Sequence, residues 1–236
     1  MPAANQKPPR KGHKGPGMEG RIARWYTRTR SKDMEDFRRQ ARTVATRLRP
    51  NSEVLEVAPG PGFFSIELAK LGNFKVTGLD ISRTFIDIAQ QNARAAGVSV
   101  DFRWGNAAEM PFPGDSFDFI YCSAAFKNFS EPVKALDEIY RVLRPGGEAL
   151  IVDLRKDVSL DEIKSYMKHS GRSAFDRWLT VFTFRHMLIK RAYTTGQLAQ
   201  MAAQSRFGSS RIDLAPISVE LHLEKPPLAL PAHGIA

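Results

Sequence analysis

The sequence predicts an α/β fold: a doubly wound, mostly parallel sheet of seven strands with helices on both faces. Short apolar runs alternate with amphipathic runs of helical period from residue 53 to residue 154. Strands that alternate with helices favour a parallel sheet, and ligands of such sheets bind beyond the carboxyl ends of the strands. Those ends are expected at Ala58, Asp80, Asn106, Ser123 and Asp153.

The elements follow in order along the chain. Residues 19–48 carry apolar side chains at helical spacing on both sides of the polar stretch 27–33, which predicts two helices. Ser82 is expected to cap a later helix, and Gly72 and Gly97 to end two of them. The remaining strands are expected within 53–58, 74–82, 98–107, 117–125 and 148–154, and the helices within 63–70, 82–97 and 131–143.

The alternation of predicted strands and helices ends after Asp153. Residues 160–190 read as helical, and a helix at 194–205 precedes two closing strands around Pro216. The domain is expected to span residues 19–226, with a helical substrate lid inserted at 155–192. Three further prolines predict that the tail at 227–236 is irregular.

The excess of positive over negative charge is confined to the start of the chain. The net charge is +10, and residues 1–50 hold 14 Lys and Arg against 4 Asp and Glu, so the rest of the chain is neutral. Residues 1–18 are rich in Pro, Gly and basic residues and poor in apolar ones, which predicts a disordered tail. Such a tail is either a solubilising terminus or an arm that seeks the phosphates of nucleic acid.

Composition limits the remaining classes. The single cysteine, Cys122, and five histidines show no ligand spacing typical of zinc, so no metal site is predicted. No apolar run reaches the roughly 20 residues of a membrane helix, and the N-terminus lacks the apolar stretch of a secretory signal. We therefore expect a cytoplasmic protein without membrane insertion.

The turn Pro59-Gly60-Pro61-Gly62 follows the first strand and opens a helix. Small residues in this context let a ligand approach the backbone and the helix N-terminus. Asp80 lies 20 residues after Gly60, at the end of the next strand, where a carboxylate can accept from both ribose hydroxyls. A purely structural corner would explain the glycines alone, but together with Asp80 they predict a ligand that contains adenosine.

Four stretches carry a resemblance to a known family: "VLEVAPGPGFFSIELA", "VTGLDIS", "GNAAEMPFPGDSFDFIYCSAAF" and "EIYRVLRPGGEALIVD". With these four stretches in this order, the chain resembles the class I S-adenosylmethionine-dependent methyltransferases. Within that class it is similar to the small-molecule branch that includes the ubiquinone/menaquinone C-methyltransferases. The resemblance implies a Rossmann-like fold, S-adenosylmethionine as cofactor and a small-molecule methyl acceptor. It runs from about residue 19 to residue 225.

The resemblance also implies a role for each matching residue. The methionine end of the cofactor would lie near Glu56, the ribose at Asp80, the adenine on Ile81 and at Asn106, and the sulfonium above Ser123. Ala58 and Asn106 depart from the family pattern, which has glycine and aspartate there. The residues implied in cofactor binding are Tyr26, Glu56, Ala58, Pro59, Gly60, Asp80, Ile81, Asn106, Ala107 and Ser123.

Candidates for chemistry and acceptor binding lie after the fourth strand. Lys127 could lower the pKa of a phenol or bind a carboxylate, although a solvated lysine is the plain alternative. His186 could act as a base, with His169 a weaker candidate, although a lone helix histidine more often packs. The substrate pocket is expected to contain Phe126, Trp178 and Phe182, which could instead be ordinary packing residues.

The sequence thus predicts methyl transfer to a small aromatic or apolar metabolite and leaves the acceptor atom open. One alternative is an RNA methyltransferase that uses the basic arm, although "SAAF" stands where an "NPPY"-like motif would be expected. The other is a protein that binds S-adenosylmethionine without methylating. Binding and label-transfer assays separate these alternatives.

Overall fold

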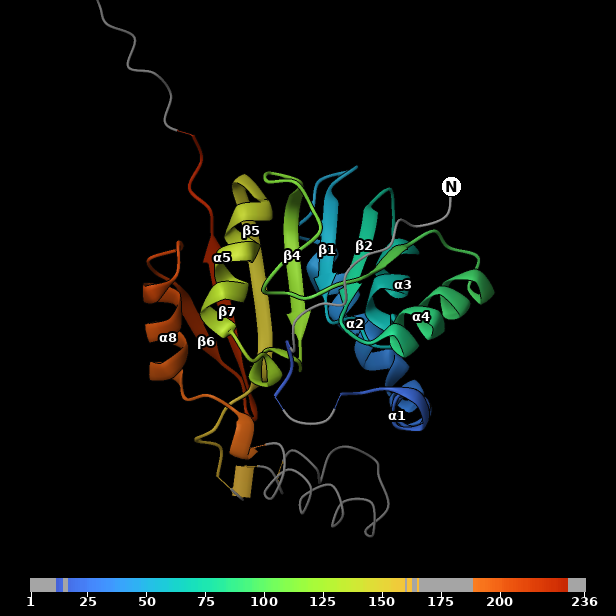
Figure 1. Ribbon diagram of the computed structural model, residues 1–236, viewed down its shortest axis with the longest axis horizontal. Helices are drawn as coiled ribbons and strands as arrows, with labels where there is room; N and C mark the ends of the chain where they lie inside the picture. The colour runs from blue at the N-terminus through green and yellow to red at the C-terminus, as the bar shows by residue number, and fades with distance from the viewer. Residues whose placement is uncertain (1–11, 15–16, 160, 163–164, 166–188, 229–236) are drawn as a thin grey trace, which may run out of the picture.

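A seven-stranded sheet forms the centre of the protein in a computed structural model, which describes residues 12–14, 17–159, 161–162, 165 and 189–228 (Figure 1). Its order is β3-β2-β1-β4-β5-β7-β6. The first five strands in this order are parallel, and β7 runs antiparallel to both of its neighbours. The strands are β1 (Glu53–Val57), β2 (Lys75–Asp80), β3 (Asp101–Trp104), β4 (Phe117–Ser123), β5 (Leu143–Leu154), β6 (Arg211–Leu214) and β7 (Ser218–Glu224).

Helices cover both faces of this sheet, which confirms the predicted fold class (Figure 1). Helices α2 and α3 bury apolar side chains against one face, and α4 extends this layer over β3. Helices α5 and α8 pack on the opposite face. The helices are α1 (Gly20–Arg30), α2 (Met34–Ala45), α3 (Phe63–Ala69), α4 (Arg83–Ala95), α5 (Pro132–Val142) and α8 (Thr195–Gln204), with 3-10 turns η1 (Ser31–Asp33), η2 (Phe126–Asn128) and η4 (Ile189–Arg191).

The buried side chains follow the strand pattern. β1 and β4 lie in the middle of the sheet and are buried along almost their whole length. Both faces of a parallel sheet are covered, so such strands carry continuous apolar runs rather than alternating ones. The core therefore has two halves, one on each side of β1, β4 and β5, and the carboxyl ends of these strands open toward a common edge.

The observed helix ends can be compared with the predicted ones. Ser82 accepts a hydrogen bond from the Phe85 N–H and so caps α4, as predicted. The helix expected to stop at Gly72 ends earlier, at Ala69. The expected lid at 155–192 lies largely outside the described residues. No helix among the described residues is both long and apolar enough to cross a membrane.

The described part of the N-terminal segment, within the predicted disordered tail, contacts the rest of the fold. His13 forms a β-bridge with Phe129, and the Lys14 N–H donates to the Asn128 carbonyl over 2.8 Å. The Ser82 hydroxyl donates to the Met18 carbonyl, and the Glu19 carboxylate accepts from the first N–H groups of α4. Residues 12–14 and 17–19 thus run across the edge of the sheet at which the parallel strands end.

Candidate functional site

The turn after β1 places three residues in the left-handed region: Ala58 (φ 59°), Gly60 (φ 55°) and Gly62 (φ 78°). A Cβ on Gly62 would lie 2.6 Å from Phe102 Cζ, so only glycine fits there. A Cβ on Gly60 would meet nothing closer than Tyr26 Cε1, at 3.9 Å. The space above Gly60 is therefore open to a ligand, and Tyr26 forms its far wall.

Ala58 is the position at which the chain departs from the glycine of the related family. Its N–H donates to the Leu79 carbonyl over 2.8 Å, which ties the start of the turn to β2. A left-handed backbone costs a non-glycine residue about 1–2 kcal/mol, because Cβ approaches the following carbonyl. The turn is thus strained at the residue that enters the site.

Asp80 holds the turn from the end of β2. Its carboxylate accepts from the Gly60 N–H at 3.0 Å and from the Ser82 N–H at 2.8 Å. Burial raises the pKa of Asp80 to about 6. A carboxylate can accept about four hydrogen bonds, so two sites remain for hydroxyl donors of a ligand.

Glu56 lies inside the site on β1 and is buried. Its Oε2 accepts from the N–H of Ser65, at 3.1 Å, and from the Ser65 hydroxyl. Burial raises the pKa of Glu56 to about 7, against the opposing effect of these hydrogen bonds. A cation bound beside Glu56 would restore the charged form, so this carboxyl is suited to an ammonium group.

A cavity of about 50 Å³ lies between this turn, α1, α2 and the end of β4. It brings together six of the ten predicted cofactor residues: Tyr26, Glu56, Ala58, Pro59, Gly60 and Ser123. Sequence analysis missed Arg30, Phe37 and Gln40, which also line it. The Arg30 guanidinium stacks on the Phe37 ring at 4.9 Å and pairs with Asp33, contacts that no local sequence pattern marks.

The adenine side of the predicted site is covered by the N-terminal segment. The Asn106 amide oxygen accepts from the Ala108 N–H, and a Cβ on Gly12 would lie 2.5 Å from that oxygen. The Ile81 carbonyl accepts from Trp104 Nε1, so this backbone is fixed beside β3. The cavity over Gly60 holds only a few water-sized groups, and Gly12 lies against the side of Asn106 that an adenine would approach.

Lys127 does not have the expected orientation. Its ammonium donates to Asp153 Oδ1 at 2.7 Å and to the Ala124 carbonyl, and the side chain is only 3% exposed. Asp153 Oδ2 also accepts from the Lys127 N–H. The side chain therefore fixes the loop after β4 to the end of β5 instead of facing a substrate.

The other predicted acceptor and catalytic residues fall into two groups. Phe126 is fully buried against Phe129 and Tyr193, so it packs behind the site and does not line an open pocket. The remaining ones lie outside the described residues: His169, Trp178, Phe182 and His186.

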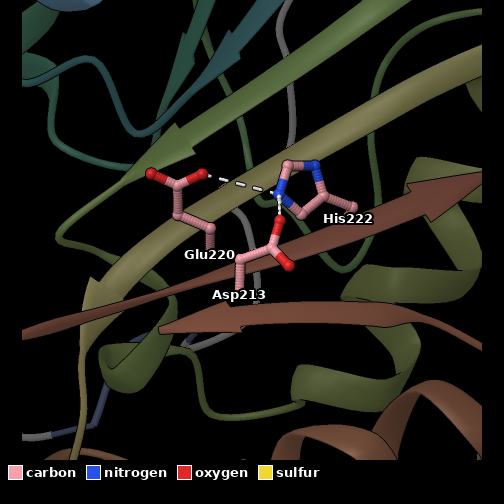
Figure 2. Close-up of side chains that lie close together, drawn as sticks. All are labelled: Asp213, Glu220 and His222. Atoms are coloured by element: carbon pink, nitrogen blue, oxygen red, sulfur yellow. Dashed lines mark ion pairs between the residues drawn. The ribbon is translucent and has the colours of Figure 1, made fainter. Parts of the chain in front are cut away.

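A cluster that sequence analysis did not identify lies on β6 and β7 (Figure 2). His222 Nε2 is 3.1 Å from an Asp213 oxygen and 3.5 Å from a Glu220 oxygen. Arg47 Nη1 lies 3.4 Å from His222 Nδ1, and Arg211 pairs with Asp213. An arginine can only donate, so it favours the tautomer with hydrogen on Nε2, the nitrogen that a metal would need.

Burial, Arg211 and Arg47 lower the pKa of His222. The guanidinium groups of Arg211, beside Asp213, and of Arg47, beside the His222 ring, also oppose binding of a metal cation. We interpret the cluster of Asp213, Glu220 and His222 as a cross-strand charge network.

The acceptor groups at the strand ends fit S-adenosylmethionine. A buried carboxyl suits its ammonium, a second carboxyl suits its ribose hydroxyls, and the open glycine between them leaves space for the ligand. The fold and this site resemble those of class I S-adenosylmethionine-dependent methyltransferases, whose cofactor is S-adenosylmethionine.

Comparison with known proteins shows which family this part of the chain is similar to. Residues 55–151 match the family described as "Methyltransferase domain". Over 118 residues the chain is 36% identical to the demethylmenaquinone methyltransferase of Deinococcus radiodurans. This alignment covers 50% of the chain and 48% of that protein. The chain is 34% identical over 118 residues to the ubiquinone/menaquinone biosynthesis C-methyltransferase of Proteus mirabilis, covering 48% of this chain and 47% of that protein.

The chain thus spans about half the length of the curated relatives that it matches. A solved structure from Methanococcus maripaludis, described as an S-adenosyl-L-methionine-dependent methyltransferase, covers far more of it. That structure superposes with a TM-score of 0.72 over 92% of this chain and 97% of its own, at 19% identity. At this identity the likeness supports the fold alone.

Proposed function

We propose that the protein transfers a methyl group from S-adenosylmethionine to a small aromatic or apolar metabolite. The observation that carries this proposal is the pair Glu56 and Asp80, two buried carboxyls on neighbouring parallel strands with an open left-handed glycine between them. A dinucleotide would require a third glycine at position 65, where this chain has Ser65 bonded to Glu56. The arrangement favours a ligand with a cationic end.

The names of the relatives support a finer proposal for the acceptor. Both curated relatives act on quinone precursors by name, and one is named as a C-methyltransferase. We infer an acceptor of the hydroquinone type that is methylated at an aromatic carbon. Such a carbon is activated when a neighbouring hydroxyl loses its proton. Once the bond to the methyl group has formed and the bond from sulfur to methyl has broken, the ring hydrogen at that carbon leaves as a proton and the hydroxyl is protonated again, so one proton is released for each methyl group transferred.

The residues of the chain act mainly by positioning. The cofactor, when bound, supplies an electrophilic methyl group. Asp80 holds ribose hydroxyls while it fixes the turn through Gly60, and Glu56 holds the ammonium. Tyr26 closes the space over Gly60, and Ser123 at the end of β4 borders the path to the acceptor. Alignment and exclusion of water are the main contributions that methyl transfer asks of a protein.

Catalytic roles for Lys127 and His186 stay predictions, as do acceptor contacts of Phe126, Trp178 and Phe182. The buried pairing of Lys127 with Asp153 favours a positioning role, since it holds Ala124, which lines the cavity. Ile81, Asn106 and Ala107 stay predicted adenine contacts that become accessible once residues 12–14 move.

Calorimetric titration with S-adenosylmethionine and S-adenosylhomocysteine, followed by transfer of a labelled methyl group, tests the proposal. A short-chain demethylnaphthohydroquinone is the acceptor, with a phenol, an amine, a thiol and transfer RNA as comparisons. Label on the ring carbon supports the finer proposal. Binding without transfer to any acceptor contradicts methyl transfer, and transfer to RNA alone supports the RNA methyltransferase alternative.

The substitution Asp80→Asn separates binding from folding. One amide oxygen replaces two carboxylate oxygens, so we expect affinity for S-adenosylmethionine to fall at least about tenfold. The neutral side chain avoids the cost of burying a charge, so the melting temperature at pH 8 is expected to stay within a few degrees. Unchanged affinity would show that the ribose assignment is wrong.

A further inference from the structure

The outer face of α1 combines exposed apolar and cationic side chains. Trp25 is 66% exposed and Ile22 is 49% exposed. Arg21, Arg24 and Arg28 are exposed on the same helix, which contains no acidic residue. Within the described part of the chain, none of these three arginines takes part in an ion pair.

Helical geometry gathers these side chains on one face. At 3.6 residues per turn, Trp25 lies at the centre, with Arg21 and Arg28 on one side and Ile22 on the other. The opposite face carries Ala23, which is fully buried. Tyr26, about a quarter turn from Trp25, packs edge-on against Phe85 and borders the space over Gly60.

We propose that α1 docks the protein on the surface of an anionic lipid bilayer. A helix with a basic polar face and a tryptophan on its apolar face lies in the plane of the headgroups, with its apolar side chains at the boundary of the acyl chains. Each exposed arginine adds attraction to anionic headgroups. The helix lies on the membrane surface and does not span it.

The aliphatic neighbour of Trp25 favours lipid over RNA as the partner. An aromatic ring beside arginines can stack on bases, but an exposed isoleucine gains nothing from a phosphate backbone. Ile22 does gain from burial among acyl chains. The apolar pair and the unpaired arginines are therefore matched to a surface that is both anionic and apolar.

Docking through α1 would bring the membrane surface close to the candidate site. Figure 1 places α1 at the edge where the parallel strands end, which is the edge that carries the cavity. A bilayer held by the outer face of α1 would lie next to the entrance of the site. This link rests on the proposed function, because it matters for an acceptor that partitions into lipid.

Vesicle sedimentation of the full chain tests the docking without cofactor or turnover. The probes are vesicles of phosphatidylglycerol mixed with phosphatidylcholine, vesicles of phosphatidylcholine alone, and transfer RNA. The test variants are Ile22→Ser with Trp25→Ser, and Arg21→Gln with Arg24→Gln and Arg28→Gln. The matched control, Leu71→Ser with Arg94→Gln, removes an exposed apolar and a basic residue elsewhere on the surface.

We expect both test variants to lose at least about tenfold in partition to the anionic vesicles, while the control binds like the natural chain. Binding should weaken with salt and be weak on phosphatidylcholine alone. Because the changed residues are exposed, melting temperature and affinity for S-adenosylmethionine should not change.

Vesicle binding that is insensitive to Ile22 and Trp25 overturns the proposal. RNA binding that is as tight and depends equally on Trp25 also overturns it, in favour of a nucleic-acid arm. Failure of methyl transfer in the assays above leaves the result of the sedimentation standing, so the two proposals fail separately.

Discussion

At the scale of single residues, the site concentrates backbone strain. Ala58 at the end of β1 and Ala124 at the end of β4 both adopt left-handed conformations, with φ of 59° and 58°. Both line the cavity. Strained residues persist where surrounding contacts determine the backbone, and such residues cluster at functional sites.

Ala58→Gly tests this strain. Relief of the left-handed penalty is offset by the greater freedom of glycine in the unfolded chain, so we expect the free energy of unfolding to stay equal or to rise by up to about 1 kcal/mol. The same change at exposed Ala199, inside α8, should lower it by about 1 kcal/mol. Urea unfolding measures both, and equal losses at the two sites would contradict the role of strain.

The buried ion pair of Lys127 and Asp153 predicts a coupled effect. Lys127→Met leaves the Asp153 carboxylate buried without its cation, and we expect a loss of about 3–5 kcal/mol in the free energy of unfolding. Adding Asp153→Asn should recover part of this loss, since no unpaired charge remains. Urea unfolding of the single and double variants gives the coupling energy; strictly additive losses would show that the pair is not a unit.

At the scale of elements, the N-terminal segment and α1 close the site through contacts with α4. Glu19 accepts hydrogen bonds from the Arg83 and Thr84 N–H groups and from the Thr84 hydroxyl. These N–H groups belong to the first turn of α4, where helix donors lack internal partners. Glu19 therefore anchors the start of α1, and with it Tyr26, to the start of α4.

Glu19→Ala should loosen this anchor. We expect a loss of about 1 kcal/mol in stability, because helix donors lose their acceptor, together with faster dissociation of S-adenosylmethionine. Stopped-flow displacement with S-adenosylhomocysteine measures the rate. Glu109→Ala, an exposed carboxylate away from α4, is the control. A lower stability with an unchanged dissociation rate would show that α1 does not gate the site.

Sequence reasoning was most successful where the cause is local. Alternating apolar runs predicted the sheet, and Ser82 predicted its own helix cap, because periodicity and capping depend on neighbours along the chain. It gave no sign that the Lys127 ammonium pairs with Asp153, which lies 26 residues away and comes close only because β4 and β5 are adjacent. The contact of residues 12–14 with Phe129 was also not predicted, because it joins residues far apart in the sequence and a short β-bridge has no periodic sequence pattern.

At the scale of the whole molecule, basic residues are concentrated near the N-terminus, whereas the site contains buried acidic residues. The excess of basic residues belongs to the first 50 residues, which include α1. The site itself contains two buried carboxyls, Glu56 and Asp80, and burial raises the pKa of both. The protein therefore presents a cationic outer face beside an interior site that prefers a cationic ligand.

This arrangement predicts how stability depends on pH. The folded chain binds protons at Glu56 and Asp80 more tightly than the unfolded chain, where their pKa values are 4.5 and 3.8. Their effect is absent below pH ~4, grows as the pH rises from about 4 to about 7 and then levels off, so they lower the free energy of unfolding over that interval. For Glu56 the full effect is about 3 kcal/mol.

Glu56→Gln isolates this contribution, since other titrating groups are the same in both proteins. Urea unfolding across the interval should show a smaller fall in stability with rising pH for the variant than for the natural chain. Binding of S-adenosylmethionine should release protons near neutral pH, because its ammonium favours the Glu56 carboxylate. Titrations in two buffers of different ionisation enthalpy measure that release. A pH slope of unfolding that is the same in Glu56→Gln and in the natural chain would place the buried proton elsewhere.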